Sequence, residues 1–198
     1  AGDAVIRVSL NELAVRVSRA LQGIGLPVGI ADDAAAIAAW HDVAGLDGIG
    51  QLRAAIPRLR AASATSPDLT VNARGTHVHA TGESLLTLAG LMVDLRELGH
   101  AGGETPLILA DLCDVGVIGG VAALAADRGL AAAFRADTED ATYYAVSHGT
   151  GVRWASGPRA KPSGGIPNEV QCWAVGQLSV WPPAGAGHVL DPDDLAEH

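Results

Sequence analysis

The spacing of apolar residues changes once along the chain, and this change constrains the fold more than any other feature. Up to about residue 64, apolar residues recur three and four positions apart, as in amphipathic helices. Beyond it, alternating runs typical of strands appear between further helical segments. Both periods in one chain of 198 residues, without a long polar linker, predict a single α+β domain. We expect a helical opening over 1–64, a mixed sheet with helices over 65–181 and an irregular tail over 182–198.

A capping box marks the start of the first helix. Ser9 and Glu12 form the Ser-x-x-Glu pattern, in which each side chain bonds a free backbone N–H at the helix start. Gly23 and Gly25 end this helix. The other expected helices are one that opens at Asp32 or Asp33, one over Gln51–Ala62 that Pro57 should kink or shorten, and one over Glu83–Leu98.

Alternating apolar residues predict the strands, and turn residues between them predict how they connect. Residues 169–181 fit either a strand or a helix. The expected strands are Val5–Val8, a hairpin of Leu69–Ala73 and Thr76–Ala80, a βαβ-like unit of Pro106–Ala110, a helix over Asp114–Arg128 and Leu130–Ala136, and a second hairpin of Tyr143–Ser147 and Val152–Ala155.

The charge of the chain excludes two classes of partner. The formal net charge is -9 and the sequence pI is about 5.1, whereas nucleic acids and anionic membranes both need a basic face. The longest apolar run, Val115–Ala126, is too short to span a bilayer, which takes about 20 residues. No secretory leader is visible in the first ten residues, and two distant cysteines make no disulfide framework. We therefore expect a cytoplasmic protein.

Three residues after the predicted strand Pro106–Ala110 form the first candidate site. Asp111 lies at the carboxyl end of that strand, where ligands bind in open α/β sheets. Cys113 lies at a helix start, which lowers the pKa of a thiol, although Asp111 and Asp114 on either side oppose a thiolate. The alternative is structural: Asp114 caps the helix, Asp111 bonds a backbone amide and Cys113 is a small buried apolar residue.

The turn of the second hairpin supplies the remaining candidates. Histidine is the side chain that most often transfers protons in catalysis, which makes His148 a candidate acid or base. The glycine-rich stretch that follows exposes amides able to hold an anion. The alternative is an ordinary hairpin turn that needs glycine at positive φ. We predict one pocket with Asp111, Cys113 and His148 as catalytic residues. The predicted ligand-binding residues are Asp114, Gly149, Thr150, Gly151 and Trp154, although core or interface packing is the other use for the tryptophan.

His77 and His79 alternate on a predicted strand and therefore share one face, where two imidazoles can bind a metal ion. A catalytic metal needs a third protein ligand, and no carboxylate nearby has a telling spacing. The alternative is two solvated histidines, and we predict no metal requirement. No Gly-x-Gly-x-x-Gly follows a strand and no Walker A sequence occurs, so the cofactor stays unknown.

Two resemblances to known families follow from longer stretches of sequence. The segments 25–52 and 173–193, with Gly25-Leu26-Pro27, Asp32-Asp33-Ala34 and Asp191-Pro192-Asp193, resemble the bacterial domain-of-unknown-function family DUF3726. The N-terminal part is also similar to the opening of the non-Rossmann malate/L-lactate dehydrogenase family. That family continues with Gly-x-x-Ser-His-Gly, where this chain has Gly45-Leu46-Asp47-Gly48-Ile49-Gly50. The resemblance implies a shared helical opening and a tendency to form dimers.

Two functions therefore stand open. One is a small-molecule domain, either an enzyme or a degenerate enzyme of organic-acid or amino-acid metabolism. The other is a non-catalytic partner subunit or interaction module that docks through apolar helices. Alanine- and glycine-rich helices, together with tryptophans concentrated in the last quarter of the chain, favour a homodimer in either case.

Overall fold

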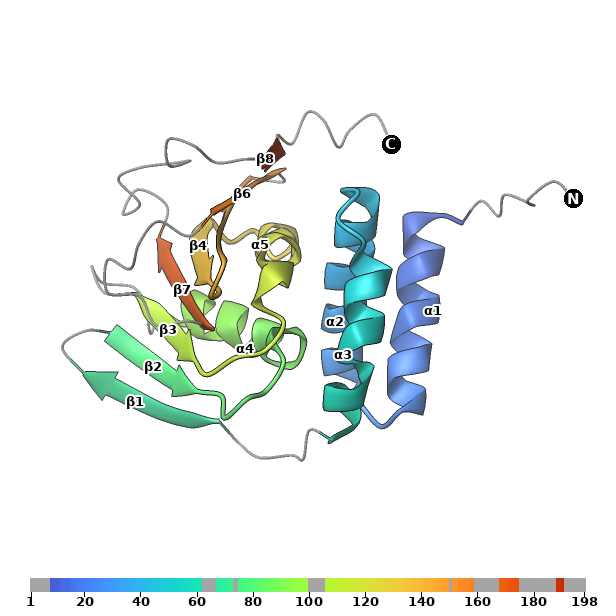
Figure 1. Cartoon of the computed structure of the whole chain (residues 1–198), viewed down its shortest axis with the longest axis horizontal. Helices are drawn as coiled ribbons and strands as arrows, with labels where there is room; N and C mark the ends of the chain where they lie inside the picture. Colours follow the sequence, from blue (N-terminus) through green and yellow to red (C-terminus); the bar gives the residue numbers. More distant parts are fainter. Residues whose placement is uncertain are drawn as a thin grey trace, which may run out of the picture.

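The computed structural model describes residues 8–61, 67–72, 75–99, 106–149, 151–158, 168–174 and 188–190. It has the predicted fold class, since helices from the N-terminal third pack beside a mixed sheet built by the rest of the chain (Figure 1). The expected strand at Val5–Val8 falls almost entirely outside the described residues, and Val8 itself is not in a strand. Within the described ranges, no helix is long and apolar enough to cross a membrane.

Three helices form the N-terminal layer: α1 (Leu10–Gly23), α2 (Val28–Val43) and α3 (Gly48–Ala61). The predicted capping box of α1 is confirmed in part, because the Ser9 side chain accepts a hydrogen bond of 3.1 Å from the Glu12 backbone N–H. The predicted start of α2 at Asp32 or Asp33 is wrong. The helix begins directly after Pro27, whose extended conformation (φ −56°, ψ 146°) leads into it without a side-chain cap.

Small residues let α2 and α3 approach closely. Gly48 opens α3 three residues earlier than predicted, and a Cβ at this position would lie 1.9 Å from the Ala38 carbonyl oxygen of α2. Pro57 lies inside α3, as expected from the sequence. Gly48 and the buried alanines of α2 (Ala34, Ala35 and Ala38) thus allow these helices to pack closely.

The rest of the described chain forms a sheet and the helices beside it. In chain order these are β1 (Asp68–Asn72), β2 (Gly75–His79), α4 (Leu85–Glu97), β3 (Leu107–Ala110), a 3₁₀ turn (Val115–Val117), α5 (Ile118–Asp127), β4 (Ala132–Asp137), β5 (Ala141–His148), β6 (Gly151–Pro158), β7 (Glu169–Ala174) and β8 (His188–Leu190). The sheet has the strand order β1-β2-β3-β7-β4-β5-β6-β8. β2 and β3 are parallel, and the other paired strands are antiparallel.

Both predicted hairpins form, but the predicted βαβ unit is interrupted. β3 and β4 do run in the same direction, yet β7 lies between them, antiparallel to both. The adjacent parallel pair is instead β2 and β3, joined through α4. Residues 169–174 resolve as strand, and β8 lies in the tail that was predicted to be irregular.

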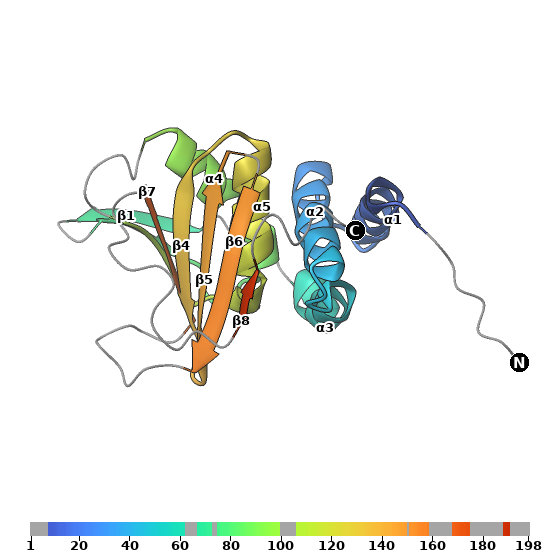
Figure 2. The same ribbon diagram turned by 90° about the horizontal axis from the view of Figure 1, so that it is seen from above.

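The domain is built in layers (Figure 2). α4 and α5 cover one face of the sheet, α2 packs on both of these helices, and α1 lies outside α2. Leu109, Phe134 and Cys172 of the sheet join Met92 of α4 and Ile118 of α5 in the buried core. The contact between α2 and α4 lies beside a large cavity.

Candidate functional site

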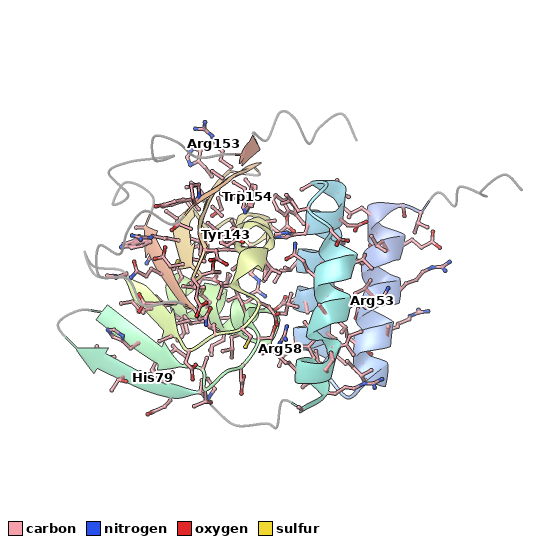
Figure 3. All side chains as sticks on the ribbon, viewed as in Figure 1. Arg53, Arg58, His79, Tyr143, Arg153 and Trp154 are labelled. Atoms are coloured by element: carbon pink, nitrogen blue, oxygen red, sulfur yellow. The ribbon has the colours of Figure 1, made fainter. Side chains whose placement is uncertain are left out.

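Asp114 connects three elements at the end of β3. The guanidinium of Arg58 in α3, labelled in Figure 3, forms an ion pair with its carboxylate. The Ser84 hydroxyl donates to the same carboxylate at 2.7 Å. Hydrogen bonding to Asp114 raises the pKa of Arg58 above its ordinary value. Ser84 also caps α4, since its oxygen accepts from the Leu86 N–H. The backbone of Asp114 has a left-handed conformation (φ 58°), and its side chain caps no helix. Its carboxylate instead connects α3 to the start of α4.

Asp111 and Cys113 lie on the same edge, in a backbone network between two loops. The Cys113 N–H donates to the Glu83 carbonyl at 2.8 Å, and the Gly82 N–H donates to the Asp111 carbonyl at 2.7 Å. Asp111 is exposed, whereas Cys113 is half-buried. Non-glycine residues with positive φ gather here, which is common at functional sites and at tight connections: Thr81, Asp111, Asp114 and Asn168.

The predicted pocket shared by Asp111 and His148 does not form. Through the register across β7 and β4, Leu109 in β3 lies level with Tyr143 in β5. Asp111 follows Leu109 at one end of the sheet, whereas β5 runs the other way and ends at His148. At about 3.3 Å per residue, roughly 20 Å separates the two along the strands. The prediction failed because it took the two loops as neighbours without knowing the strand directions.

The other residues of the predicted hairpin site have structural surroundings. Gly149 occupies the turn with φ 60°, as the alternative interpretation expected, and Thr150 lies outside the described residues. Gly151 begins β6 and lines a separate cavity of about 430 Å³ with Trp40. Trp154 is buried and packs against Gly119 of α5, where a Cβ would lie 2.7 Å from its ring (Figure 3).

His77 and His79 lie on the face of the sheet opposite the core residue Val78. His79 is exposed, and the register places Asp68 of β1 directly opposite it. In the part of the chain that the structure describes, no three His, Cys, Asp or Glu side chains are grouped so as to hold a metal ion.

A cavity of about 960 Å³ lies between α2, α3 and α4. Its size is within the range of small-molecule sites in proteins. Apolar side chains and a few charged groups share its walls, a composition typical of such sites. The lining residues include Leu26, Ile30, Leu59, Leu88 and Leu91 with the polar groups Asp32, Asp33, Arg60, Glu83, Thr87, Asp94 and Arg128.

An ion-pair chain fixes one side of this cavity. Arg128, directly after α5, bonds both carboxylate oxygens of Asp33 in α2 at 3.0 and 3.1 Å and also pairs with Asp94 in α4. Gly90 makes the approach of α2 to α4 feasible, because a Cβ there would lie 2.2 Å from the Asp33 Oδ2. Three helices thus meet at one guanidinium.

The cavity is acidic and adjoins the edge where β2 and β3 end. Four carboxylates line it against the two guanidinium groups of Arg60 and Arg128. Glu83 of the lining precedes Ser84, and the Thr87 hydroxyl donates to the Ser84 carbonyl at 2.7 Å. Arg60 lies two residues after Arg58 on α3, so the Asp114 contacts hold this wall in place. The predicted residues Asp111, Cys113 and Asp114 lie at the neighbouring edge of the sheet and do not line the cavity, which the sequence prediction did not include. The signal was Gly90, a glycine inside a helical pattern, which often marks a close approach.

A second polar cluster lies on the other face of the sheet and was also missed. Arg135 pairs with Asp137 at 2.9 Å, and the Thr142 hydroxyl donates to Asp137 at 2.6 Å. Glu169 lies directly opposite Asp137 across β4 and β7, and the Gln171 side chain donates to it at 2.5 Å. Both carboxylates are buried, at 3% and 8% exposure. Charged residues at alternate positions of a predicted strand were the available signal.

Comparison with solved structures defines the class of fold. The chain is similar to a dehydrogenase from Sinorhizobium meliloti (TM-score 0.60, 16% identity, covering 80% of this chain and 56% of that one). It is also similar to malate dehydrogenase from Pyrococcus horikoshii OT3 (0.58, 16%, 76% and 50%) and to sulfolactate dehydrogenase from Methanocaldococcus jannaschii (0.55, 15%, 78% and 51%). The resemblance to malate/lactate dehydrogenases is therefore confirmed at the level of the fold. The chain spans about half the length of these enzymes.

The model of a protein family, "Protein of unknown function (DUF3726)", matches residues 8–84, as the first resemblance predicted. This range contains the N-terminal motifs on which that resemblance rests, but not those of 173–193. This range contains α1, α2 and α3 and the residues of the cavity lining from Ile24 to Glu83. None of the curated proteins matches the sequence.

Proposed function

We propose that this chain is a small-molecule-binding domain of organic-acid or amino-acid metabolism, an enzyme or degenerate enzyme, that holds its ligand between α2, α3 and α4. The observation that carries the proposal is the cavity of about 960 Å³, with its mixed lining. Similarity to organic-acid dehydrogenases supports the metabolic assignment as an analogy of fold.

The charges of the cavity favour a ligand with an amino group. The lining has four carboxylates but only two guanidinium groups, so its acidic side chains outnumber its basic ones. The net charge of -9 also disfavours a dianionic ligand. Arg60 lies near the end of α3, where it can pair with a carboxylate of the same ligand. An amino acid or a similar amino-bearing organic acid satisfies both signs of charge.

In this proposal, the residues that follow β3 position the cavity wall and do not react with the ligand. Asp114 already binds Arg58 and Ser84, so it acts on the ligand only through the cavity wall. Asp111 and Cys113 are not among the residues that line the cavity. Where the similar dehydrogenase family has Ser-His, this chain has Gly48-Ile49, which favours binding without hydride transfer.

Thermal unfolding in the presence of amino acids, hydroxy acids, amines and nicotinamide cofactors tests the proposal. A ligand at 100 times its Kd adds about 2.7 kcal/mol of stability, so an amino-bearing compound should raise Tm by several degrees. Arg60→Gln should abolish the rise for carboxylate-bearing ligands. Arg53→Gln removes an exposed arginine on the same helix that does not line the cavity, and should leave the rise intact (Figure 3).

Leu91→Trp fills the cavity and should abolish binding of every ligand class. The proposal is wrong if no compound raises Tm, or if Arg53→Gln and Leu91→Trp leave binding equally intact.

The second candidate function, a non-catalytic partner subunit, rests on apolar side chains around α1. Val8, Leu10, Val15 and Val28 are large apolar residues exposed on the outermost helix or beside it. Val15 and Val28 line the same shallow hollow, and exposed apolar groups that lie together mark interaction sites. Light scattering at rising concentration tests this candidate: Val15→Lys with Val28→Lys should lower the apparent mass, because the apolar contact at α1 is lost, without removing association through other surfaces. An apparent mass that this double substitution leaves unchanged argues against the candidate.

A further inference from the structure

β1 is the first strand of the sheet, and it carries no covering element among the residues that the structure describes. Every described side chain from Asp68 to Val71 is exposed, with Leu69 at 47% and Val71 at 70%. Soluble proteins usually protect such an edge with lysine, proline, a bulge or an inward charge. In the five-residue strand Asp-Leu-Thr-Val-Asn the one charged side chain is that of Asp68 at its first position, and the central residues carry no lysine, proline or bulge.

The hydrogen-bond pattern of β2 identifies which backbone groups of β1 face outward. The Thr76 N–H donates to the Pro106 carbonyl on the β3 side, at 3.3 Å. Alternate residues of a strand bond in opposite directions, so His77 faces β1 and bonds its register partner Thr70. Leu69 and Val71 therefore present their N–H and C=O groups to the outside.

We propose that β1 pairs with β1 of a second copy of this chain, antiparallel and centred on Thr70. In this register Leu69 lies opposite the partner's Val71, and Val71 lies opposite the partner's Leu69. The outward N–H and C=O groups of these two residues then bond those of the partner, as in the hydrogen-bonded pairs of an antiparallel ladder. The two sheets become one continuous sheet with a two-fold axis at Thr70.

The side chains suit this register. Leu69 and Val71 lie on the same face as the core residue Val78, so two copies bring four exposed apolar side chains together around the axis. Asp68 lies opposite the partner's Asn72, so no like charges face each other directly. Each copy carries a net charge of -9, so the association should strengthen with salt.

Sedimentation velocity over a hundredfold range of concentration tests the pairing. Wild-type protein should shift from monomer to dimer, and Val71→Lys should raise the dissociation constant by tenfold or more. Leu98→Lys is the matched control, because Leu98 is an equally exposed apolar residue (74%) just after α4. The proposal is overturned by a monomer at all concentrations, or by equal effects of the two lysine variants.

A disulfide across the axis tests the register itself. Thr70 lies opposite the partner's Thr70 in a non-hydrogen-bonded pair, where the two Cα atoms are about 4.5 Å apart and a disulfide fits. In a Cys113→Ser background, Thr70→Cys should form a covalent dimer under mild oxidation. His79→Cys, an exposed position one strand further in, should not (Figure 3). Equal cross-linking of the two variants, or none at Thr70→Cys, would contradict the register.

Discussion

His41 of α2 accepts a hydrogen bond of 3.0 Å at Nε2 from the backbone N–H of Gly120 in α5. The imidazole is fully buried, and burial lowers its pKa from 6.5 to about 4, with the backbone of Val117 opposing the shift. The ring must therefore stay neutral for its Nε2 to accept this bond. A neutral histidine thus joins the N-terminal helical layer to the helix that covers the sheet.

This arrangement predicts a loss of stability in mild acid. The unfolded chain binds a proton at His41 below about pH 6.5, whereas the folded chain resists it until about pH 4. The contribution of His41 is thus fully present above pH 6.5 and falls as the pH drops toward 4, by about 3 kcal/mol in total. Urea denaturation at several pH values should show this slope, and His41→Gln should remove it. His79→Gln changes an exposed histidine and should retain it; identical slopes in both variants would contradict the assignment.

A glycine in α4 gives the second prediction. Gly90→Ala places a Cβ 2.2 Å from the Asp33 Oδ2, so the carboxylate must shift and weaken its bonds to Arg128. We expect a loss of about 1 kcal/mol in the free energy of unfolding instead of the gain of about 0.5–1 kcal/mol usual for glycine to alanine in a helix. In an Asp33→Ala background the same change should become neutral or stabilising, which a double-mutant cycle measures.

Gly29→Ala is the control for that cycle, since nothing lies within 4 Å of a Cβ at this helical glycine. It should stabilise the protein in either background. A cost for Gly90→Ala that persists without the Asp33 carboxylate would show that another contact is responsible.

The third prediction concerns the ties made by Asp114. Asp114→Ala frees Arg58 and the Ser84 hydroxyl, and should cost roughly 1–3 kcal/mol because the carboxylate is largely buried while Arg58 is half-exposed. The proposed ligand should bind more weakly as the α3–α4 wall loosens. Arg58→Gln should cost less than 1 kcal/mol, and the two changes together should cost less than their sum. Strict additivity in chemical denaturation would contradict the shared contact.

The sequence predicted those features of the fold that form between residues close together in the chain. Ser9 and Glu12 interact within one helical turn, and the β5–β6 hairpin closes on neighbouring residues, so both were predictable from short stretches. β7 was not predictable, because its place between β3 and β4 depends on pairing between distant segments. The error at His148 follows from this, since the strand directions set which loops meet.

The same limit applied to the candidate site, because residues adjacent in the sequence could be grouped but distant ones could not. Asp111, Cys113 and Asp114 were identified because they follow a buried strand, and they do lie at a strained edge of the sheet. The cavity beside that edge combines Asp33, Asp94 and Arg128 from three helices. No spacing in the sequence relates those residues. His41 gave no signal either, because a buried histidine inside an alanine-rich helix has no distinctive pattern.

The last prediction separates two buried carboxylates that face each other across β4 and β7. Asp137→Leu leaves the partly exposed Arg135 guanidinium and the Thr142 hydroxyl without their acceptor, and should cost about 2–4 kcal/mol. Glu169→Gln removes a negative charge directly opposite Asp137, so relief of the repulsion should offset the loss of the bond from Gln171. We expect its net effect on the free energy of unfolding to lie within about 0.5 kcal/mol of zero. Urea midpoints at neutral pH measure both, and a larger cost for Glu169→Gln than for Asp137→Leu would mean that Glu169, not Asp137, is the main partner of the cluster.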